Sequence, residues 1–396
     1  MVKPYYGYLP INAKSLKKGS EPFHKSLEPI VEETQARSKT GTDFSNVYFP
    51  SRMLFKRDVL YNDSGFSSNI GTLTSPPLQV LFYSLFTQYF DFSTSLFIHI
   101  FIQIFIFIIF CFLVHREYKS KDIDLLAWSV TLSLTALLFT EVGLAWFERG
   151  QHSLYAASGL ISLLLGFKTK KLQYFFFAAI LASMKWASFP LLFLIWPYLL
   201  FLFPKKDLFQ RLVSFLPAWI IFVAGILISA FIMPSHFQDY INIILSFEAN
   251  LLPVGISLGT KVPLWLSKLF PFLHLLASLI LYRLFTDQFG KWRKAFIINA
   301  IFSVGMICTM FGTICFHYRV LIMLGFLPFL FYLKDEFDSA EQRSMLIFNG
   351  SLGLLFLFRI LAFETAGIVY SYLIVSMYIL ISPFLWRKFF KSLNIT

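Results

Sequence analysis

The stretch FSTSLFIHIFIQIFIFIIFCFLV, residues 92–114, is apolar and long enough to cross a bilayer as one helix. A spanning helix needs roughly 20 predominantly apolar residues. The rest of the chain has the same character, because 57% of its 396 residues are hydrophobic and its mean hydropathy is +0.67. A soluble fold could not hide so much apolar surface. The sequence therefore predicts an all-α polytopic membrane protein.

Further apolar segments follow this one, and together they predict about eleven transmembrane helices. Several are shorter than an upright span requires, and the segment at 172–184 would cover only about 20 Å at about 1.5 Å per residue. We expect Lys185, which follows this short segment, to lie below the outer surface in a cavity. The predicted spans are 92–114, 123–141, 152–167, 172–184, 187–203, 212–233, 263–285, 295–314, 316–333, 345–362 and 367–386.

Basic residues gather in alternate turns between the apolar segments. The positive-inside rule assigns such turns to the cytoplasm. About half of the 34 Lys and Arg residues fall there, so membrane topology accounts for much of the net charge of +12 without a nucleic-acid partner. The basic residues of these turns are Arg116, Lys119, Lys121, Lys168, Lys170, Lys171, Lys205, Lys206, Arg211, Arg283, Lys291, Arg293, Lys294, Lys334, Arg343, Arg387, Lys388 and Lys391.

The chain divides into four parts by composition. The Pro76-Pro77 pair opens an apolar stretch that we expect to lie along the membrane interface as a helix. The largest later outer loop, at 234–262, is long enough to cover a cavity as a lid. The four parts are a polar N-terminal tail at 1–42, an extracytoplasmic loop at 43–91, a transmembrane helical domain at 92–386 and a basic cytoplasmic tail at 387–396.

The ionisable groups outside the basic turns lie at the opposite helix ends. A charge in hydrocarbon costs several kcal/mol, so an intramembrane ionisable cluster is a functional-site hypothesis by default. Each residue also has an ordinary structural interpretation that involves no function. An aspartate such as Asp43 is commonly a helix cap or turn residue, and Lys185 could snorkel to water. The groups are Glu141, Glu148, Arg149, Lys185, His317 and Arg319.

A series of motifs runs in order through nearly the whole chain. An outer aspartate is followed by aromatic residues, a Leu-Tyr pair and a Pro-Pro pair. A Gly-Gln pair then opens a span, and a lysine has a proline five residues later. In these motifs the chain resembles the polyprenyl-phosphate-dependent glycosyltransferases of the GT-C superfamily, specifically glycosyltransferase family 87, which includes mycobacterial mannosyl- and arabinofuranosyltransferases. The matching positions are Asp43, Tyr48, Leu60-Tyr61, Pro76-Pro77, Gly150-Gln151, Gly159, Lys185, Pro190 and His317-Tyr318.

The resemblance implies an integral membrane enzyme of the bacterial inner membrane with its site on the extracytoplasmic side. It would transfer one sugar, a mannose or a pentose, from a polyprenyl-phosphate donor to a hydroxyl of a glycolipid or glycan acceptor, with inversion. The implied roles are a general base at Asp43, donor-phosphate binding by Lys185, His317 and Arg319, and contacts to the donor sugar or acceptor from Tyr48, Arg149, Gln151 and Tyr318.

The chemistry of these residue types agrees with such roles. A carboxylate within hydrogen-bond reach can accept the proton of an attacking hydroxyl. Cations in a water-poor cavity can stabilise a departing phosphate. No cofactor is expected, since the lipid-phosphate sugar is a substrate. The spacing of Cys111, Cys308 and Cys315 indicates neither a disulfide framework nor a zinc site, and a metal requirement stays open.

The N-terminus departs from the family pattern. Family members carry a spanning helix ahead of the loop aspartate, and with about eleven spans the basic tail at 1–42 would lie outside, against the charge rule. A start position placed too far downstream is the expected explanation.

Two other function classes stay open. A transporter or flippase of a lipid-linked sugar would share short helices and an outer cavity, but it would need no base, and we find no internal repeat that favours it. A polysaccharide polymerase or ligase would carry an Arg-rich outer loop, whereas the loop at 234–262 has Lys261 as its only basic residue.

Overall fold

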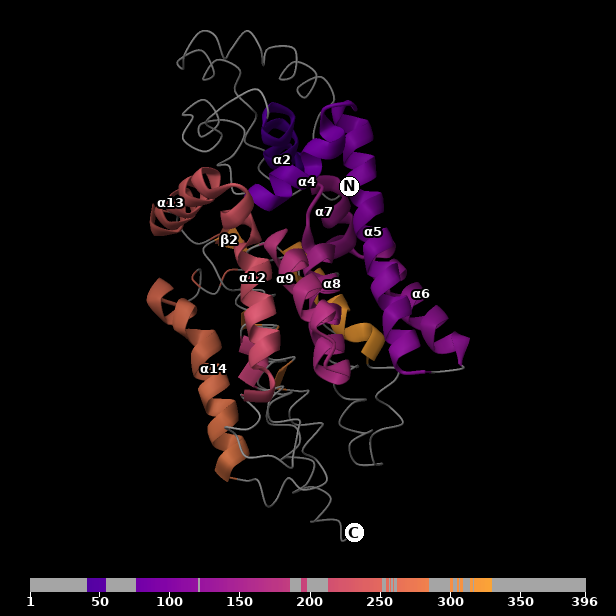
Figure 1. Ribbon diagram of the computed structural model, residues 1–396, viewed down its shortest axis with the longest axis vertical. Helices are drawn as coiled ribbons and strands as arrows, with labels where there is room; N and C mark the ends of the chain where they lie inside the picture. The colour runs from indigo at the N-terminus through magenta and orange to yellow at the C-terminus, as the bar shows by residue number, and fades with distance from the viewer. Residues whose placement is uncertain are drawn as a thin grey trace. The chain divides into compact units, whose positions relative to one another are not determined.

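The computed structural model describes most of the chain between residues 41 and 329 (Figure 1). This part of the chain is predominantly helical, as predicted. The strands within it are one parallel pair of two residues each, β1 (Val254–Gly255) and β2 (Ile314–Cys315). The described residues are 41–54, 76–119, 122–185, 194–197, 213–250, 254–255, 257, 259, 262–284, 300–301, 305, 307–308, 314–315 and 317–329.

The chain clusters into two compact units, and each is described on its own. Unit 1 holds the described parts of Met1–Gln103, together with Ala145–His152 and Leu227–Asn250. Unit 2 holds Ile104–Leu144 and the described parts of Ser153–Ile226 and Leu251–Thr396.

Aromatic packing joins two of the described helices of unit 1, α2 (Thr42–Met53) and α4 (Pro77–Thr87). Phe44 of α2 is fully buried. Its ring centroid lies 5.9 Å from that of Tyr83 on α4 and 5.6 Å from that of Phe92. Burying a ring of this size contributes about 1.5–3 kcal/mol, so these contacts hold α2 in place.

Unit 2 contains an antiparallel helical hairpin. Helices α8 (Ser153–Thr169) and α9 (Leu172–Ser183) lie side by side (Figure 1). A Cβ on Gly159 of α8 would lie 3.3 Å from the carbonyl oxygen of Ala178, so the glycine allows the two backbones to approach closely. The 3₁₀ helix η5 (His317–Phe326) also packs on α8. Helix α8 is therefore buried on almost every side, which explains its apolar sequence.

Helix α5 (Phe92–Glu117) is long and apolar enough to cross a membrane by itself, and among the described residues no other single helix is. Two sharply bent pairs also qualify if each pair is taken as one span, which would give up to three spans. These pairs are α6 (Ile123–Phe139) with α7 (Glu141–Arg149), and α12 (Leu216–Ile232) with α13 (Pro234–Asn250). Such helices fit a membrane protein, and the eleven-span topology stays a prediction.

Six predicted spans coincide with helices. The structure places α5, α6, α8, α9, α12 and α14 (Leu264–Leu284) over the segments predicted at 92–114, 123–141, 152–167, 172–184, 212–233 and 263–285. The segment predicted at 316–333 begins as the 3₁₀ helix η5. The prediction that a short helix ends just before Lys185 is confirmed, because α9 ends at Ser183 with Met184 as its C-cap residue.

Two segments that the sequence predicted as loops are helical. Phe44, Val47 and Tyr48 are all fully buried, and their spacing of three and four residues gives α2 an apolar face that outweighs its polar composition. The outer loop expected at 234–262 begins with α13, which has Pro234 at its first helical position, where a missing N–H is tolerated.

Other predicted parts lie outside the described residues in whole or in large part. They are the tail at 1–42, the stretch at 55–75, the spans predicted at 187–203, 295–314, 345–362 and 367–386, and the tail at 387–396.

Candidate active site

Helix α7 ends in a Schellman cap centred on Gly150. The N–H of Gly150 donates to the carbonyl of Phe147 at 3.1 Å, and the N–H of Gln151 donates to the carbonyl of Trp146 at 3.0 Å. These two bonds define the motif, which requires a left-handed residue after the helix. Gly150 has φ 63°, a conformation that costs other residues about 1–2 kcal/mol. The capping of α7 therefore explains why glycine stands at position 150, directly before Gln151.

The N-terminus of α2 docks on this cap. Gly41, at φ 78°, precedes α2, and its N–H donates to the carbonyl of Glu148 at 2.5 Å. The positive end of the α2 dipole thus meets the negative end of the α7 dipole. The contact leaves no room for a side chain, since a Cβ on Gly41 would lie 2.8 Å from the ring of Phe92.

This docking brings together three of the predicted site residues, Asp43, Arg149 and Gln151. Arg149 donates through Nε to Asp43 Oδ2 at 2.5 Å and through Nη2 to Oδ1 at 2.8 Å. The side-chain amide of Gln151 also donates to Asp43 Oδ2. The carboxylate is 16% exposed and the guanidinium side chain 21% exposed. A bidentate pair of this kind, partly shielded from water, fixes both the position and the orientation of the carboxylate.

The carboxylate keeps some acceptor capacity in this arrangement. An ionised carboxylate offers about four lone-pair positions. Described residues occupy three of them, two on Oδ2 and one on Oδ1. A hydroxyl group could donate to the remaining position on Oδ1.

A buried polar stripe on α5 holds the backbone of the same cap. Ser95, His99 and Gln103 are each fully buried, one helical turn apart. His99 Nε2 lies 3.1 Å from the carbonyl of Gly150, and Gln103 Nε2 donates to the carbonyl of Gln151 at 2.8 Å. The two residues that follow Arg149 are therefore held through their carbonyls as well as through the Schellman bonds.

The ring of His99 lies within hydrogen-bond distance of three polar groups. Its Nε2 atom lies 3.1 Å from the carbonyl oxygen of Gly150 and 3.0 Å from Nε2 of Gln103, and its Nδ1 atom pairs with the hydroxyl of Tyr83. The ring of His99 also stacks on Phe44, at 4.9 Å between centroids and 21° between planes. Through these contacts His99 links α4, α5 and the α7 cap.

Sequence reasoning missed Tyr83, His99 and Gln103. The available signal was the four-residue spacing of Ser95, His99 and Gln103 within the apolar run of α5. That spacing places polar side chains on one face of the helix, where they need partners.

Replacing Gln103 with leucine is expected to destabilise unit 1 by about 1–3 kcal/mol, because the buried carbonyl of Gln151 loses its donor. The thermal unfolding midpoint of the purified protein measures this effect. Gln79→Leu is the matched control. Gln79 is 2% exposed, and its Nε2 has no hydrogen-bond partner among the residues that the structure describes. Its replacement should leave the midpoint nearly unchanged, and equal losses in both variants would contradict the assigned role of Gln103.

The remaining predicted residues lie in different surroundings. Tyr48 is fully buried in unit 1 and its hydroxyl donates to the carbonyl of Phe90 at 3.2 Å, the contact of a structural residue. In unit 2 the ammonium of Lys185 lies 5.9 Å from the ring centroid of Tyr318, which is 5% exposed. Arg319 follows Tyr318 on η5 and is half-buried.

His317 is the first residue of η5, and its side chain lies outside the described part of the structure. The structure brings together Lys185, predicted to bind the donor phosphate, and Tyr318, predicted to contact the donor sugar or the acceptor. Their contact places an aromatic face beside a lysine, which is a favourable cation–π arrangement.

Comparison with known proteins gives no assignment. No protein-family model matches the chain. No curated protein matches it either. Across the described residues, no group of three or more His, Cys, Asp or Glu side chains could hold a metal ion. The fold and the site therefore define a broad class of protein. It is a helical protein that fits a membrane and carries a partly shielded cluster of Asp43, Arg149 and Gln151.

Proposed function

We propose that the chain is an integral membrane glycosyltransferase of the GT-C type that transfers one sugar from a polyprenyl-phosphate donor to an acceptor hydroxyl on the extracytoplasmic face. The eleven-span topology, the bacterial inner membrane and the likeness to glycosyltransferase family 87 are parts of this proposal. The observation that carries it is the cluster of Asp43, Arg149 and Gln151.

The geometry of this cluster suits a general base. The reaction needs a carboxylate that accepts a proton from the attacking hydroxyl while the hydroxyl is held in line with the anomeric carbon. Arg149 and Gln151 fix the Asp43 carboxylate from one side, and an acceptor position on Oδ1 stays available to a hydroxyl. The ion pair of Asp43 and Arg149 is equally suited to a structural role, that of joining α2 to α7. Substitution of Asp43 separates this structural role from that of a general base.

The second support is the pairing of Lys185 with Tyr318. Both stand at positions that match the family motifs, on segments far apart in the sequence. Lys185 follows the short helix α9 and is half-buried. A half-buried ammonium near an aromatic ring suits the phosphate of a lipid donor, whose leaving charge it would stabilise.

Incubation of the purified protein with a panel of radiolabelled polyprenyl-phosphate sugars tests the proposal most directly. We expect one sugar, a mannose or a pentose, to appear on an added glycolipid or glycan acceptor. If labelled donor crosses the bilayer of a reconstituted vesicle without any transfer, the protein is instead a flippase of the lipid-linked sugar.

Lys185→Ala is expected to weaken donor binding about 10–100-fold, because a charge-assisted contact to a phosphate contributes about 1.5–3 kcal/mol. Acceptor binding should change little. Titration of each substrate against the protein measures both affinities. Lys268→Ala, on α14, is the control for the loss of a lysine, and an unchanged donor titration in Lys185→Ala would remove the assignment.

A further inference from the structure

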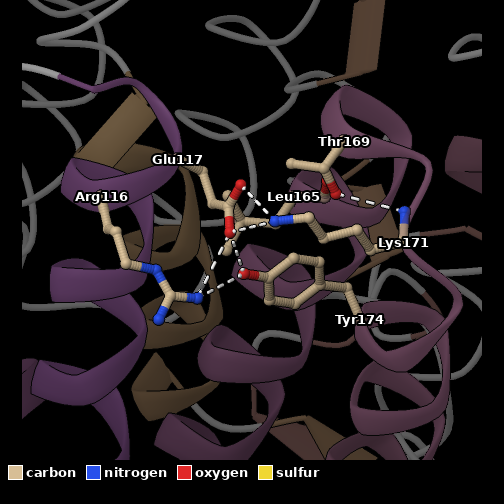
Figure 2. A network of polar contacts seen from close by, with 6 residues as sticks. All are labelled: Arg116, Glu117, Leu165, Thr169, Lys171 and Tyr174. Atoms are coloured by element: carbon tan, nitrogen blue, oxygen red, sulfur yellow. Dashed lines mark hydrogen bonds and ion pairs between the residues drawn. The ribbon is translucent and has the colours of Figure 1, made fainter.

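A cluster of cations gathers in unit 2 where α5 and α8 end and α9 begins. Figure 2 shows Arg116 and Glu117 at the end of α5 directed toward Lys171 and Tyr174 at the start of α9. The cluster joins the turn after α5 to the turn between α8 and α9, two of the turns whose basic residues predict a cytoplasmic location. Its five cations are Arg116, Lys119, Lys168, Lys170 and Lys171, all of them exposed.

Glu117 organises the cluster. Its Oε1 accepts from Lys171 Nζ at 2.8 Å, from the Tyr174 hydroxyl at 2.8 Å and from Arg116 Nη2 at 3.3 Å, and its Oε2 accepts from Lys171 Nζ at 2.9 Å (Figure 2). The Glu117 side chain is 11% exposed, whereas the side chains of Arg116 and Lys171 are 55% and 49% exposed. The carboxylate thus holds cations from both turns while leaving them open to a ligand.

The other lysines are placed by their own contacts. Lys168 Nζ lies 3.5 Å from the ring centroid of Tyr118, which anchors it beside the end of α5. Lys119 and Lys170 follow the ends of α5 and α8 in left-handed conformations, with φ 51° and 59°. Asp122 and Asp124 stand at the start of α6. Together with Glu117 they supply three carboxylates, so the five cations outnumber these acidic side chains.

Exposed apolar surface adjoins the cations on the same helices. Phe112, one turn before Arg116, is 51% exposed, and Phe177 on α9 is 47% exposed. The ring of Phe177 lies 6.5 Å from that of Phe110 on α5, so α5 and α9 meet at this level. A ligand that covers the whole surface therefore needs an anionic group and hydrocarbon chains. A polyanion without chains would leave the rings uncovered.

We propose that this cluster binds the headgroup of an anionic phospholipid, with the acyl chains lying on Phe112 and Phe177. Lys and Arg side chains near an anionic bilayer surface are attracted to the charged headgroups. The positive-inside rule explains why basic residues occur at this end, but it requires no fixed arrangement. The bonds of Glu117 supply that arrangement. This lipid site is independent of the proposed transfer chemistry.

Native mass spectrometry of the full chain in detergent tests the proposal. The probes are phosphatidylglycerol and phosphatidylcholine with the same acyl chains, and glycerol 3-phosphate as a headgroup without chains. Phosphatidylglycerol should bind at least tenfold more tightly than either of the others. The double variant Arg116→Gln/Lys168→Gln should lose about tenfold or more of this affinity, with an unchanged unfolding midpoint.

Lys268→Gln is the matched control for a lost cation outside the cluster, and it should bind phosphatidylglycerol like the unaltered protein. The proposal is overturned by equal binding of the two phospholipids. It is also overturned if glycerol 3-phosphate binds as tightly as phosphatidylglycerol, which indicates a site for free anions. If the double variant unfolds early, Lys119→Gln/Lys170→Gln takes its place, and undiminished lipid binding by that variant also overturns the proposal.

Discussion

Replacement of Asp43 by asparagine is expected to lower the rate of sugar transfer about 10²–10⁴-fold, because the amide cannot accept the proton of the acceptor hydroxyl. Asparagine is close to isosteric and keeps one oxygen that can accept from Arg149 or Gln151, so the docking of α2 on α7 should persist. Donor binding should be retained, since Lys185 and Arg319 are unaltered. The measurements are turnover of radiolabelled donor, donor affinity and the unfolding midpoint.

Asp239→Asn is the control, because it makes the same chemical change on α13 at a half-buried position. Its turnover should match that of the unaltered protein. If Asp43→Asn transfers sugar at a near-normal rate but melts early, then the carboxylate serves as the bridge between α2 and α7, and the assignment of a base fails.

Gly150→Ala is expected to destabilise the protein by about 2–5 kcal/mol. Part of this cost is the left-handed conformation at φ 63°, which is strained for alanine. The rest is overpacking, since a Cβ would lie 2.6 Å from Cβ of Phe44 and 2.7 Å from Cδ1 of Leu96. Relief of the clash would pull α2 from the cap and separate Asp43 from Gln151. Thermal unfolding, followed by scanning fluorimetry in detergent, measures the loss.

Gly159→Ala is the matched control for the Gly150 prediction. A Cβ on Gly159 would have its nearest neighbour at 3.3 Å, and a helical alanine is preferred over glycine by about 1 kcal/mol. The midpoint of this variant should change little. Equal midpoints for the two alanine variants would mean that the α2 contact with Gly150 is not present in the folded protein.

Helix positions were accessible from the sequence because they depend on local properties. The apolar run at 92–114 has the length of a span, and α5 occupies it. Asp122 directly precedes α6 and accepts from the backbone of Asp124, as an N-cap residue does. The early end of α9, two residues before Lys185, could be recognised in the same way.

The partners of buried polar side chains were harder to predict from the sequence. The interaction of His99 with Gly150 and that of Asp43 with Arg149 each join segments that no periodicity relates. Asp43 and Arg149 were both singled out, but as separate candidates with separate roles. Their bidentate contact, across 106 positions of the chain, appears only when α2 folds as a helix and docks on α7. A segment interpreted as a loop could not predict that geometry.

The sequence by itself determined that the chain is helical, that α5 can cross a membrane and that the α5 end and the α8–α9 turn carry an excess of basic residues. These properties follow from hydrophobicity and charge along short windows of chain. The tertiary structure decided which side chains face one another: Asp43 with Arg149, Lys185 with Tyr318, and Glu117 with Lys171. Such pairs depend on the packing of helices distant in sequence, and packing is set by side-chain shape and close glycine contacts rather than by composition.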